Sequence, residues 1–428
     1  MKTLTAAIQF GSSHICASAA WIDANGQREV VGIESSNTNG CIHHGCVVNI
    51  EDTAVIIKSL FKKLSNRART DINAAYCGVC AISMHSQEFR PSMLVGDATT
   101  VSPEVEEQLK QMSLEVAIPH HDILGLFDNG YTINEQMAIG NHQLIVAESR
   151  LKQGICAAME RAQIRVAGIL TSPLMLADIL TDEEKQQGCL LLDMGAQLTT
   201  LAIFSNGKLA TLKVIPFGGN SVTNDIASNN LRLEEAEMLK TSWSDASRPK
   251  NNGKEAQTQI PSMSQIELNI IVSSRLEELA ANIERQIVKA GFKGKLAGGC
   301  VLTGGASLQR GLTTLLNRRL EILKISTRSC NTIRFSMSER KPNYAALMAM
   351  LGHCTEACAA TPAPAAPAPV AEKSASAASP APLQNQAADI AQGNRNQTSV
   401  RDTSGNDIGD KVRKGFGSFI GDLFSGMD

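Results

Sequence analysis

The stretch CLLLDMGAQLTTLAIFSNGKLATLKVIPFGGNSVTNDIA, residues 189–227, decides the fold of this chain. Its apolar run CLLLD predicts a buried strand, and Gly195 then begins a turn. LTTLAIF (198–204) predicts a second strand, Asn206-Gly207 a hairpin turn, and KLATLKVIP (208–216) a third strand. A glycine pair, Gly218-Gly219, leads into a helical stretch. This order of elements predicts an α/β lobe.

The beginning of the chain repeats the same order. TLTAAIQF (3–10) and HICASAAWI (14–22) predict two strands joined by a turn of small residues, Gly11-Ser12-Ser13. After Asn25-Gly26 comes a third strand, and residues 52–66 have apolar side chains at helical spacing. Chance similarity between two meanders is the alternative. A true duplication predicts two α/β lobes that face a cleft.

The turns after buried strands are the candidate ligand sites, because exposed backbone N–H groups in tight turns bind phosphate oxygens. A third turn follows the strand that ends at Thr303, where a glycine pair allows the backbone to approach a flat ligand closely. Each turn alone is a weak signal. Together they give these nucleotide-binding candidates: Gly11, Ser12, Ser13, Asp193, Gly195, Thr199, Gly218, Gly219, Gly304 and Gly305.

Three stretches carry a resemblance to a known family: VIPFGGNSVTNDIA (214–227), EEAEMLK (234–240) and VLTGGASLQRGL (301–312). They resemble the actin, Hsp70 and sugar-kinase superfamily, and within it the FtsA family of bacterial cell-division proteins. The resemblance implies a cleft for ATP and Mg²⁺, with Glu237 and Lys240 flanking the ribose and base. The alternative for that pair is an ordinary ion pair at i,i+3 on a helix.

Three residues depart from the superfamily pattern. Gln9 stands where an acid is usual, and Ala196 and Gln197 stand where glycines are usual. An amide holds Mg²⁺ less well than a carboxylate, and we expect Ala and Gln to adopt the backbone conformations of glycine at a cost. The sequence therefore predicts altered nucleotide binding and slow or absent hydrolysis. Asp193 remains the best Mg²⁺ candidate, through water.

The fold class expected is α/β: a duplicated actin-like, ribonuclease H-like two-domain ATPase fold with a relocated subdomain. The resemblance implies the relocated segment, for which the sequence itself offers weak strands near 131–133 and 142–148 and a helix near 150–162. The expected parts are 1–83 with 162–186 (subdomain 1A), 84–161 (inserted 1C), 187–218 with 297–355 (2A), 219–296 (2B), a linker at 356–409 and a terminal helix at 410–428.

The C-terminal region differs in composition from the rest. Residues from about 359 to 408 are rich in Pro, Ala and Ser, which predicts a disordered linker. Residues 411–427 (KVRKGFGSFIGDLFSGM) predict an amphipathic membrane-binding helix, with a protein groove as the alternative target. The candidate lipid contacts are the apolar Val412, Phe416, Phe419, Ile420, Leu423 and Phe424 and the basic Lys411, Arg413 and Lys414.

The resemblance also implies partners. They are the tubulin-like FtsZ, further copies of this chain in a polymer, and other division proteins, at the cytoplasmic face of the membrane and the division site. The surface between about 225 and 295 is the expected contact for FtsZ. Two alternatives are an actin-like adaptor of the pilus-assembly type, and a sugar or acetate-type kinase. The adaptor would not need its own lipid-binding tail, and the kinase would need a catalytic carboxylate that the sequence does not reveal.

Bulk properties exclude several other classes. A net charge of -2 and an aromatic content of 4% argue against nucleic-acid binding. No run reaches the ~20 apolar residues of a transmembrane helix, and we interpret the N-terminus as a strand rather than a signal peptide. Eleven scattered cysteines favour free thiols. Cys41, His43, His44 and Cys46 lie close in sequence, so the loop is either a metal site or an ordinary polar loop.

Overall fold

The structure is a computed structural model of the 428-residue chain, and it describes residues 2–247, 259, 260, 262–330 and 341–359. The chain divides into two compact units, Met1–Ala363 and Pro364–Asp428. The second unit lies outside the described residues, and so do the predicted terminal helix and most of the predicted linker. The predictions for those segments therefore stay predictions.

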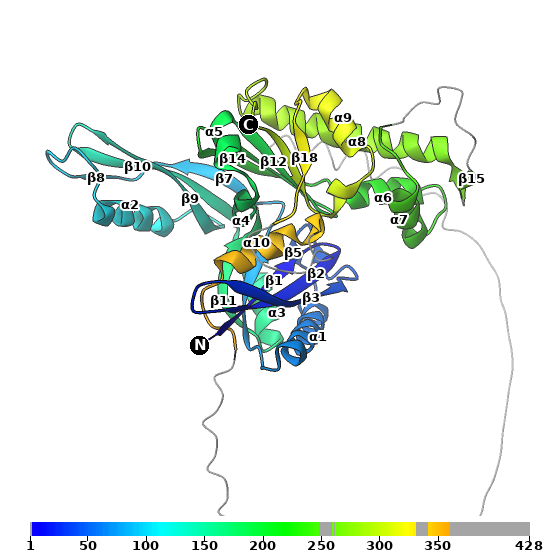
Figure 1. Cartoon of the computed structure of the whole chain (residues 1–428), viewed down its shortest axis with the longest axis horizontal. Coiled ribbons are helices and arrows are strands. Elements are labelled where there is room, and N and C mark those ends of the chain that lie inside the picture. The colour runs from blue at the N-terminus through cyan, green and yellow to red at the C-terminus, as the bar shows by residue number, and fades with distance from the viewer. Residues whose placement is uncertain (1, 248–258, 261, 331–340, 360–428) are drawn as a thin grey trace, which may run out of the picture. The chain divides into compact units, whose positions relative to one another are not determined.

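The first lobe is built on a sheet of five strands (Figure 1). In spatial order they are β11 (Arg165–Thr171), β6 (Ala74–Val79), β1 (Thr3–Phe10), β2 (His14–Ile22) and β3 (Arg28–Asn37). β1 pairs antiparallel with β2 and parallel with β6. The predicted strands at 3–10 and 14–22 are confirmed at these bounds. Because the carboxyl ends of β1 and β6 share one edge, the turn after β1 opens at the edge where ligands bind in such sheets.

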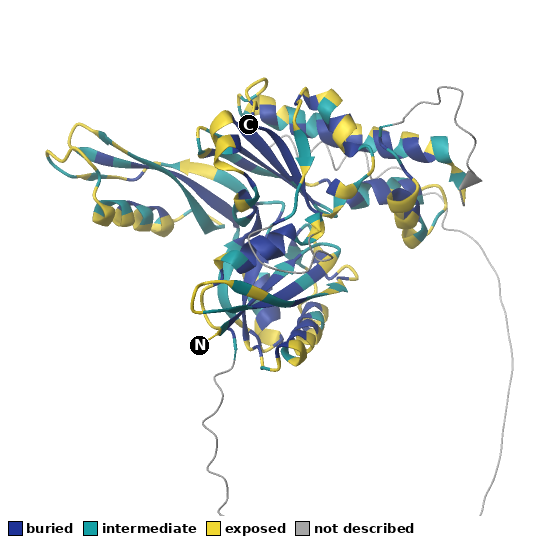
Figure 2. Ribbon diagram, in the orientation of Figure 1, coloured by how far each residue is buried: buried dark blue, intermediate teal, exposed yellow. Residues whose placement is uncertain are grey.

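Helices cover both sides of this sheet. α1 (Ile50–Ala68) packs against β2 and β3 and against α3 (Ser149–Arg161), whereas α10 (Ala345–His353) packs against β1, β2 and β6. Asn49 caps α1 by accepting from the backbone N–H of Asp52. The predicted helix at 52–66 is confirmed within α1. α10 is buried along most of its length, which fits its place between two layers of structure (Figure 2).

The second lobe has the repeated plan. β12 (Cys189–Met194), β13 (Thr199–Ser205) and β14 (Lys208–Ile215) form an antiparallel meander, and α6 (Gly219–Ala227) follows. β17 (Gly299–Thr303) and β18 (Ile325–Thr327) extend the sheet in parallel on the other side of β12. The repeated order of strand, turn, strand, hairpin, strand and helix is thus confirmed in both halves.

Helices of the second lobe build its own hydrophobic core. α7 (Leu233–Ser242), α8 (Gln265–Lys289) and α9 (Leu312–Leu320) contribute buried leucines and isoleucines to it. Short elements complete the described chain: β4 (Ile42–His43), β5 (Cys46–Val47), α4 (Ser172–Met175), η1 (Leu176–Ile179), α5 (Asp182–Gln187), β15 (Gln259–Ile260), β16 (Met263–Ser264), η2 (Gly305–Leu308) and η4 (Pro342–Tyr344).

Residues 85–148 form a long extension of the second sheet. β7 (His85–Phe89) pairs with β14, and β10 (Met137–Glu148) pairs with β7, β8 (Ser92–Leu94) and β9 (His121–Asn134). α2 (Pro103–Glu115) packs on β9 and β10. The weak strands expected near 131–133 and 142–148 are confirmed, but they are parts of strands much longer than predicted. β9 is only partly buried along almost its whole length (Figure 2), so its apolar pattern is faint.

None of the helices in the described ranges combines the length and hydropathy that crossing a bilayer requires. The subdomain boundaries expected from the resemblance stay a prediction.

Candidate functional site

The turns after β1 and β12 have the same backbone closure. In the first turn the N–H of Gly11 donates to the carbonyl oxygen of His14 (3.1 Å), and in the second the N–H of Gly195 donates to Leu198 (2.8 Å). Each turn joins the first two strands of its lobe. The duplication therefore extends to hydrogen bonds at the predicted ligand site.

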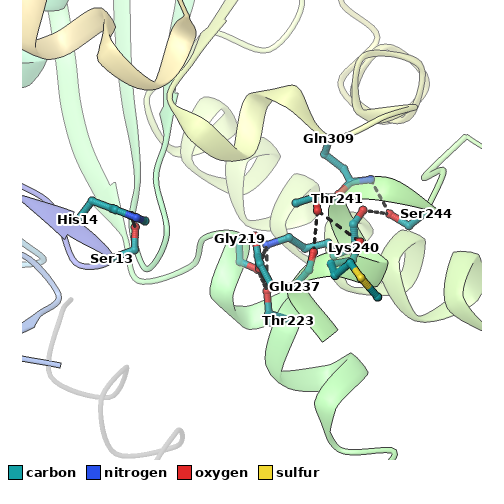
Figure 3. A network of polar contacts seen from close by, with 10 residues as sticks. Ser13, His14, Gly219, Thr223, Glu237, Lys240, Thr241, Ser244 and Gln309 are labelled. Carbon is teal, nitrogen blue, oxygen red and sulfur yellow. Dashed lines mark hydrogen bonds and ion pairs between the residues drawn. The ribbon is translucent and has the colours of Figure 1, made fainter. Parts of the chain in front are cut away.

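Contacts within the first lobe hold the first turn. The hydroxyl of Thr38 donates to the carbonyl of Ser12 (2.8 Å), and the N–H of Gly45 donates to the Ser12 hydroxyl (3.2 Å). The Ser13 hydroxyl lies 3.1 Å from Nδ1 of His14 (Figure 3). The structure thus gathers the predicted residues Gly11, Ser12 and Ser13 into one well-supported turn.

The second turn rests on the N-terminus of α6. Backbone N–H groups of Gly219 and Asn220 donate to the carbonyls of Gly195 (3.0 Å) and Ala196 (2.7 Å). A Cβ on Gly218 would lie 2.5 Å from both of these carbonyl oxygens, so only glycine fits there. The hydroxyl of the fully buried Thr199 donates to Phe217 (2.7 Å). The predicted set Gly195, Thr199, Gly218 and Gly219 is therefore one packed unit.

The third turn meets the second along parallel strands. β17 pairs with β12 in a register that sets Thr303 beside Asp193. Gly304 has φ +83° and leaves no room for a Cβ, which would lie 2.5 Å from Oδ1 of Asp193 and from the carbonyl oxygen of Met194. The hydroxyl of Ser307 donates to the Gly304 carbonyl (2.6 Å), and Gly305 begins η2 as an exposed residue. Asp193 and the glycine pair thus meet at one edge of the sheet.

Asp193 is the carboxylate nearest these turns. Its residue is partly exposed, yet the surrounding protein desolvates the carboxyl group and raises its pKa to about 6. A single carboxylate suits Mg²⁺, which keeps several waters and usually takes one or two protein carboxylates together with phosphate oxygens. In the part of the chain that the structure describes, no group of three or more His, Cys, Asp or Glu side chains is placed to hold a metal by itself.

Glu237 and Lys240 lie one turn apart on α7, as expected, and Lys240 also bonds to residues of α6. Nζ of Lys240 donates to Oε2 of Glu237 (2.6 Å), to the hydroxyl of Thr223 (2.9 Å) and to the carbonyl of Gly219 (3.2 Å). Lys240 is buried and Glu237 is half exposed. Figure 3 shows this network at the start of α6. A Cβ on Gly219 would lie 3.3 Å from Nζ of Lys240 and 3.4 Å from Cβ of Ala306. α6, α7 and η2 therefore converge on one spot.

The cost expected for Ala196 and Gln197 is absent, and that expectation is wrong. Within the described residues, the non-glycine positions with positive φ include neither of them. The turn closes with a bond from the N–H of Gly195 to the carbonyl of Leu198 while the two residues between keep negative φ. Position 197 differs from glycine through its side chain instead: Oε1 of Gln197 accepts from the N–H of His44 (2.7 Å).

The role of the hairpin formed by β4 and β5, residues 42–47, was not predicted from the sequence. Its donors do not form a metal cluster, since Cys41 is buried while His43 is exposed. His44 (φ +47°) and Gly45 (φ +82°) make its turn, and a Cβ on Gly45 would lie 1.9 Å from the carbonyl oxygen of Cys80. The 42–47 hairpin thus lies between the two turns. The glycine in its own tight turn, Gly45, is the local feature of the sequence that could have indicated a hairpin there.

Sequence comparison finds relatives of this chain. A family model described as "Cell division protein FtsA" matches residues 190–349. The cell division protein FtsA of Porphyromonas gingivalis is 31% identical over 330 residues, which cover 72% of this chain and 69% of that protein. The FtsA of Pseudomonas aeruginosa is 28% identical over 331 residues, or 72% and 79% of the two chains.

A solved structure shares the fold at low sequence identity. A chain of a "PilM-PilN type IV pilus biogenesis complex" superposes with a TM-score of 0.62 at 19% identity, covering 81% of this chain and 98% of that chain. At this identity the likeness concerns the actin-like architecture alone.

Proposed function

This chain belongs to the FtsA family of actin-like cell-division proteins, and from that membership we propose that it binds ATP with Mg²⁺, self-associates and anchors FtsZ to the membrane. The observation that carries the nucleotide part is the convergence of three strand-end turns with the start of α6. Glycine is required sterically at Gly218 and Gly304, where a side chain would occupy the turns. Backbone N–H groups in turns of this kind are suited to bind phosphate groups.

Each predicted residue has a place in this proposal. The turns at 11–13 and 195–199 offer backbone to the phosphates, and Gly304-Gly305 offers a flat approach for the adenosine. Glu237 and Lys240 lie at the ribose and base side, where Lys240 is already fixed by three acceptors. Asp193 would hold Mg²⁺ through water, and the ion would neutralise phosphate charge. With Gln9 in place of an acid we expect slow or absent hydrolysis.

Nucleotide binding can be tested by adding a single methyl group at the start of α6. Gly219→Ala adds a methyl group that must fit within 3.3 Å of Nζ of Lys240 and 3.4 Å of Cβ of Ala306, which narrows the site. We expect calorimetric titration with ATP and Mg²⁺ to show at least tenfold weaker binding than for the unmodified chain. Gly154→Ala in α3 is the matched control, because its new methyl group lies 3.4 Å from Cβ of Val47, at the open end of the 42–47 hairpin. The turns are contacted by His44 and Gly45 at the other end of that hairpin. Equal affinity in all three proteins would count against the site.

The partner part of the proposal concerns α7 and α8, within the surface expected at about 225–295. Large apolar side chains are exposed there: Leu233 (56%), Met238 (44%), Trp243 (38%) and Ile270 (46%). The side-chain amide of Gln265 at the start of α8 donates to the carbonyl of Trp243 (2.5 Å), so the two helices present one surface. Exposed aromatic and Met side chains are typical anchors of protein interfaces. The polar segment at 248–258 lies outside the described residues.

The membrane part depends on residues 411–427. Seven apolar side chains fall on one face of that segment if it is helical, and full burial would contribute on the order of 10 kcal/mol. Burial in the interface is partial, and ordering a glycine-rich segment is costly. One tail should therefore bind reversibly, and several tails on a polymer should bind firmly. Attachment and self-association are then coupled.

The decisive experiment is co-sedimentation of the full chain and of a chain without 411–428 with liposomes of anionic lipid. We expect the full chain to pellet and to bring FtsZ with it, and the shortened chain to stay in solution. Retention of the shortened chain on liposomes would refute the membrane role. An adaptor of the pilus-assembly type should not need the tail, so the same comparison separates the two classes of scaffold.

A further inference from the structure

The turns at 11–13 and 195–199 belong to different lobes, and one side chain from each, Ser12 and Gln197, bonds to the same 42–47 hairpin. Successive N–H groups of the 42–47 hairpin donate to the two turns: Gly45 to the Ser12 hydroxyl (3.2 Å) and His44 to Oε1 of Gln197 (2.7 Å). The first bond stays within the first lobe. The second crosses from the first lobe to the second.

Both ends of the crossing bond are fixed in place. On the first-lobe side, the carbonyl of His44 accepts from the N–H of Ile82 (3.3 Å), and Gly45 lies against the carbonyl of Cys80. On the second-lobe side, the turn that carries Gln197 is bonded to the start of α6 by Gly219 and Asn220. A hydrogen bond between two rigid parts resists their separation, because neither side can follow the other.

A second contact between the two lobes lies close to the first. Sγ of Cys80, just after β6 in the first lobe, is 3.2 Å from the hydroxyl of Thr200 in β13 of the second lobe. Thr200 follows the turn of Gln197 by only three residues. The two lobes are therefore joined by polar contacts at two neighbouring points, beside the apolar core to which both lobes contribute, and Cys80 can report whether these contacts stay closed.

We propose that the Gln197 side chain, bonded to the amide of His44, is a latch that holds the two lobes together at these turns without nucleotide. A glycine at this position could not form it. In a two-lobe protein without such a bond, a ligand that touches both turns supplies the link. Here the chain supplies it, so the closed form does not depend on ATP. The inference rests on the proposed function only in naming the turns as phosphate sites.

The test uses the full chain without nucleotide. Hydrogen–deuterium exchange is followed in peptides covering residues 41–48, for the unmodified protein and for Gln197→Ala. We expect exchange at His44 to be roughly three- to tenfold faster in the variant, the effect of losing one ordinary hydrogen bond. Gln309→Ala is the matched control: it removes another partly exposed glutamine, whose amide donates to Ser244 (2.8 Å) within the second lobe.

Alkylation of Cys80 by iodoacetamide gives an independent readout of lobe separation. The thiol is partly exposed, yet the surrounding protein desolvates it and raises its pKa to about 12, so it reacts slowly while the two lobes stay in contact. We expect several-fold faster labelling in Gln197→Ala and no change in Gln309→Ala. Unchanged exchange at 41–48 would overturn the proposal, and so would faster exchange with unchanged labelling of Cys80, or equal acceleration in the control. Since no nucleotide is present, a failure of ATP binding would leave each of these results interpretable.

Discussion

The two strand-end turns at 10–14 and 194–199 share a closing backbone hydrogen bond and have different neighbours. Both are closed by one N–H to carbonyl bond, from Gly11 in the first and from Gly195 in the second. The first turn is supported from its own lobe by Thr38 and by the 42–47 hairpin. The second is packed on the start of α6 and also reaches the other lobe through Gln197.

This difference shows how a duplicated element can diverge. The residues between the ends of the two turns differ, but none of them has a positive φ, so residues other than glycine fit there without left-handed strain. Ser12 and Gln197 both accept an N–H from the 42–47 hairpin, yet one serves its own lobe and the other joins two lobes. The backbone of the turn is thus a constant, and the side chains decide what the turn holds.

The largest effect is expected where the second turn meets α6. In Gly218→Ala the new Cβ would lie 2.5 Å from the carbonyl oxygens of Gly195 and Ala196, and backbone atoms cannot move aside as side chains do. We expect the free energy of unfolding to fall by about 3 kcal/mol, measured by urea titration followed by circular dichroism. Among the described residues, no backbone N–H at the start of a helix donates to the first turn.

Gly219→Ala is the matched variant, one residue away. Its nearest contacts would be the tip of Lys240 at 3.3 Å and Cβ of Ala306 at 3.4 Å, and the lysine tip can shift. We expect it to lower stability by under about 1 kcal/mol. If both variants lost the same free energy of unfolding, the close contact of residue 218 with the carbonyls of the second turn would not be what stabilises the turn on α6.

A smaller effect is expected at the edges of the two sheets, which also differ. In the second lobe the guanidinium of Arg328, just after β18, donates twice to Glu184 (2.5 and 2.8 Å), and Glu184 is only 4% exposed. In the first lobe Arg67 contacts Glu34 of β3 (2.7 Å) but is itself half exposed. We expect Glu184→Gln to lower stability at pH 7 by roughly 2 kcal/mol and Glu34→Gln by under about 1 kcal/mol.

The pH dependence of the free energy of unfolding gives a further test of the pair Glu184 and Arg328. Arg328 holds the pKa of the Glu184 carboxyl below its usual value, with help from the backbone and hydroxyl of Thr181. A lowered folded-state pKa stabilises the protein above the unfolded-state pKa of about 4.3, and that stability is lost as the pH falls through the folded-state value. Unfolding curves of the unmodified chain and Glu184→Gln should therefore approach each other in acid. A gap that stays constant down to pH 3 would contradict this assignment.

Local pattern predicted the elements but not the contacts between them. The strands at 3–10 and 14–22 were predictable because apolar runs end at small-residue turns, and the i,i+3 pair Glu237 and Lys240 because both lie on one helix. The contact from His44 to Gln197 joins residues 153 positions apart and leaves no periodic trace. The expected backbone cost at position 197 was wrong for a local reason, because neither Ala196 nor Gln197 has a positive φ.

The smallest expected effect compares the two closing glycines directly. Neither has a left-handed φ, so only space decides what a methyl group does. In Gly11→Ala the Cβ would lie 2.7 Å from the carbonyl oxygen of His14, the acceptor of the closing bond, whereas in Gly195→Ala it would lie 3.1 Å from that of Leu198. Both substitutions also reduce the entropy of the unfolded chain, which stabilises by about 0.4–1 kcal/mol.

The steric cost of the new methyl group outweighs the gain from the unfolded chain in the first turn and roughly cancels it in the second. We expect Gly11→Ala to lower the free energy of unfolding by about 1.5 kcal/mol, because the closing bond must stretch, and Gly195→Ala to change it by about 0.5 kcal/mol or less. Thermal unfolding of the two variants side by side is sufficient, since they share one chemical change and one turn geometry. A larger loss of stability in Gly195→Ala than in Gly11→Ala would contradict this prediction. It would mean that packing on α6 prevents the second turn from adjusting to the methyl group, and that this packing matters more than the distance from the new Cβ to the carbonyl oxygen.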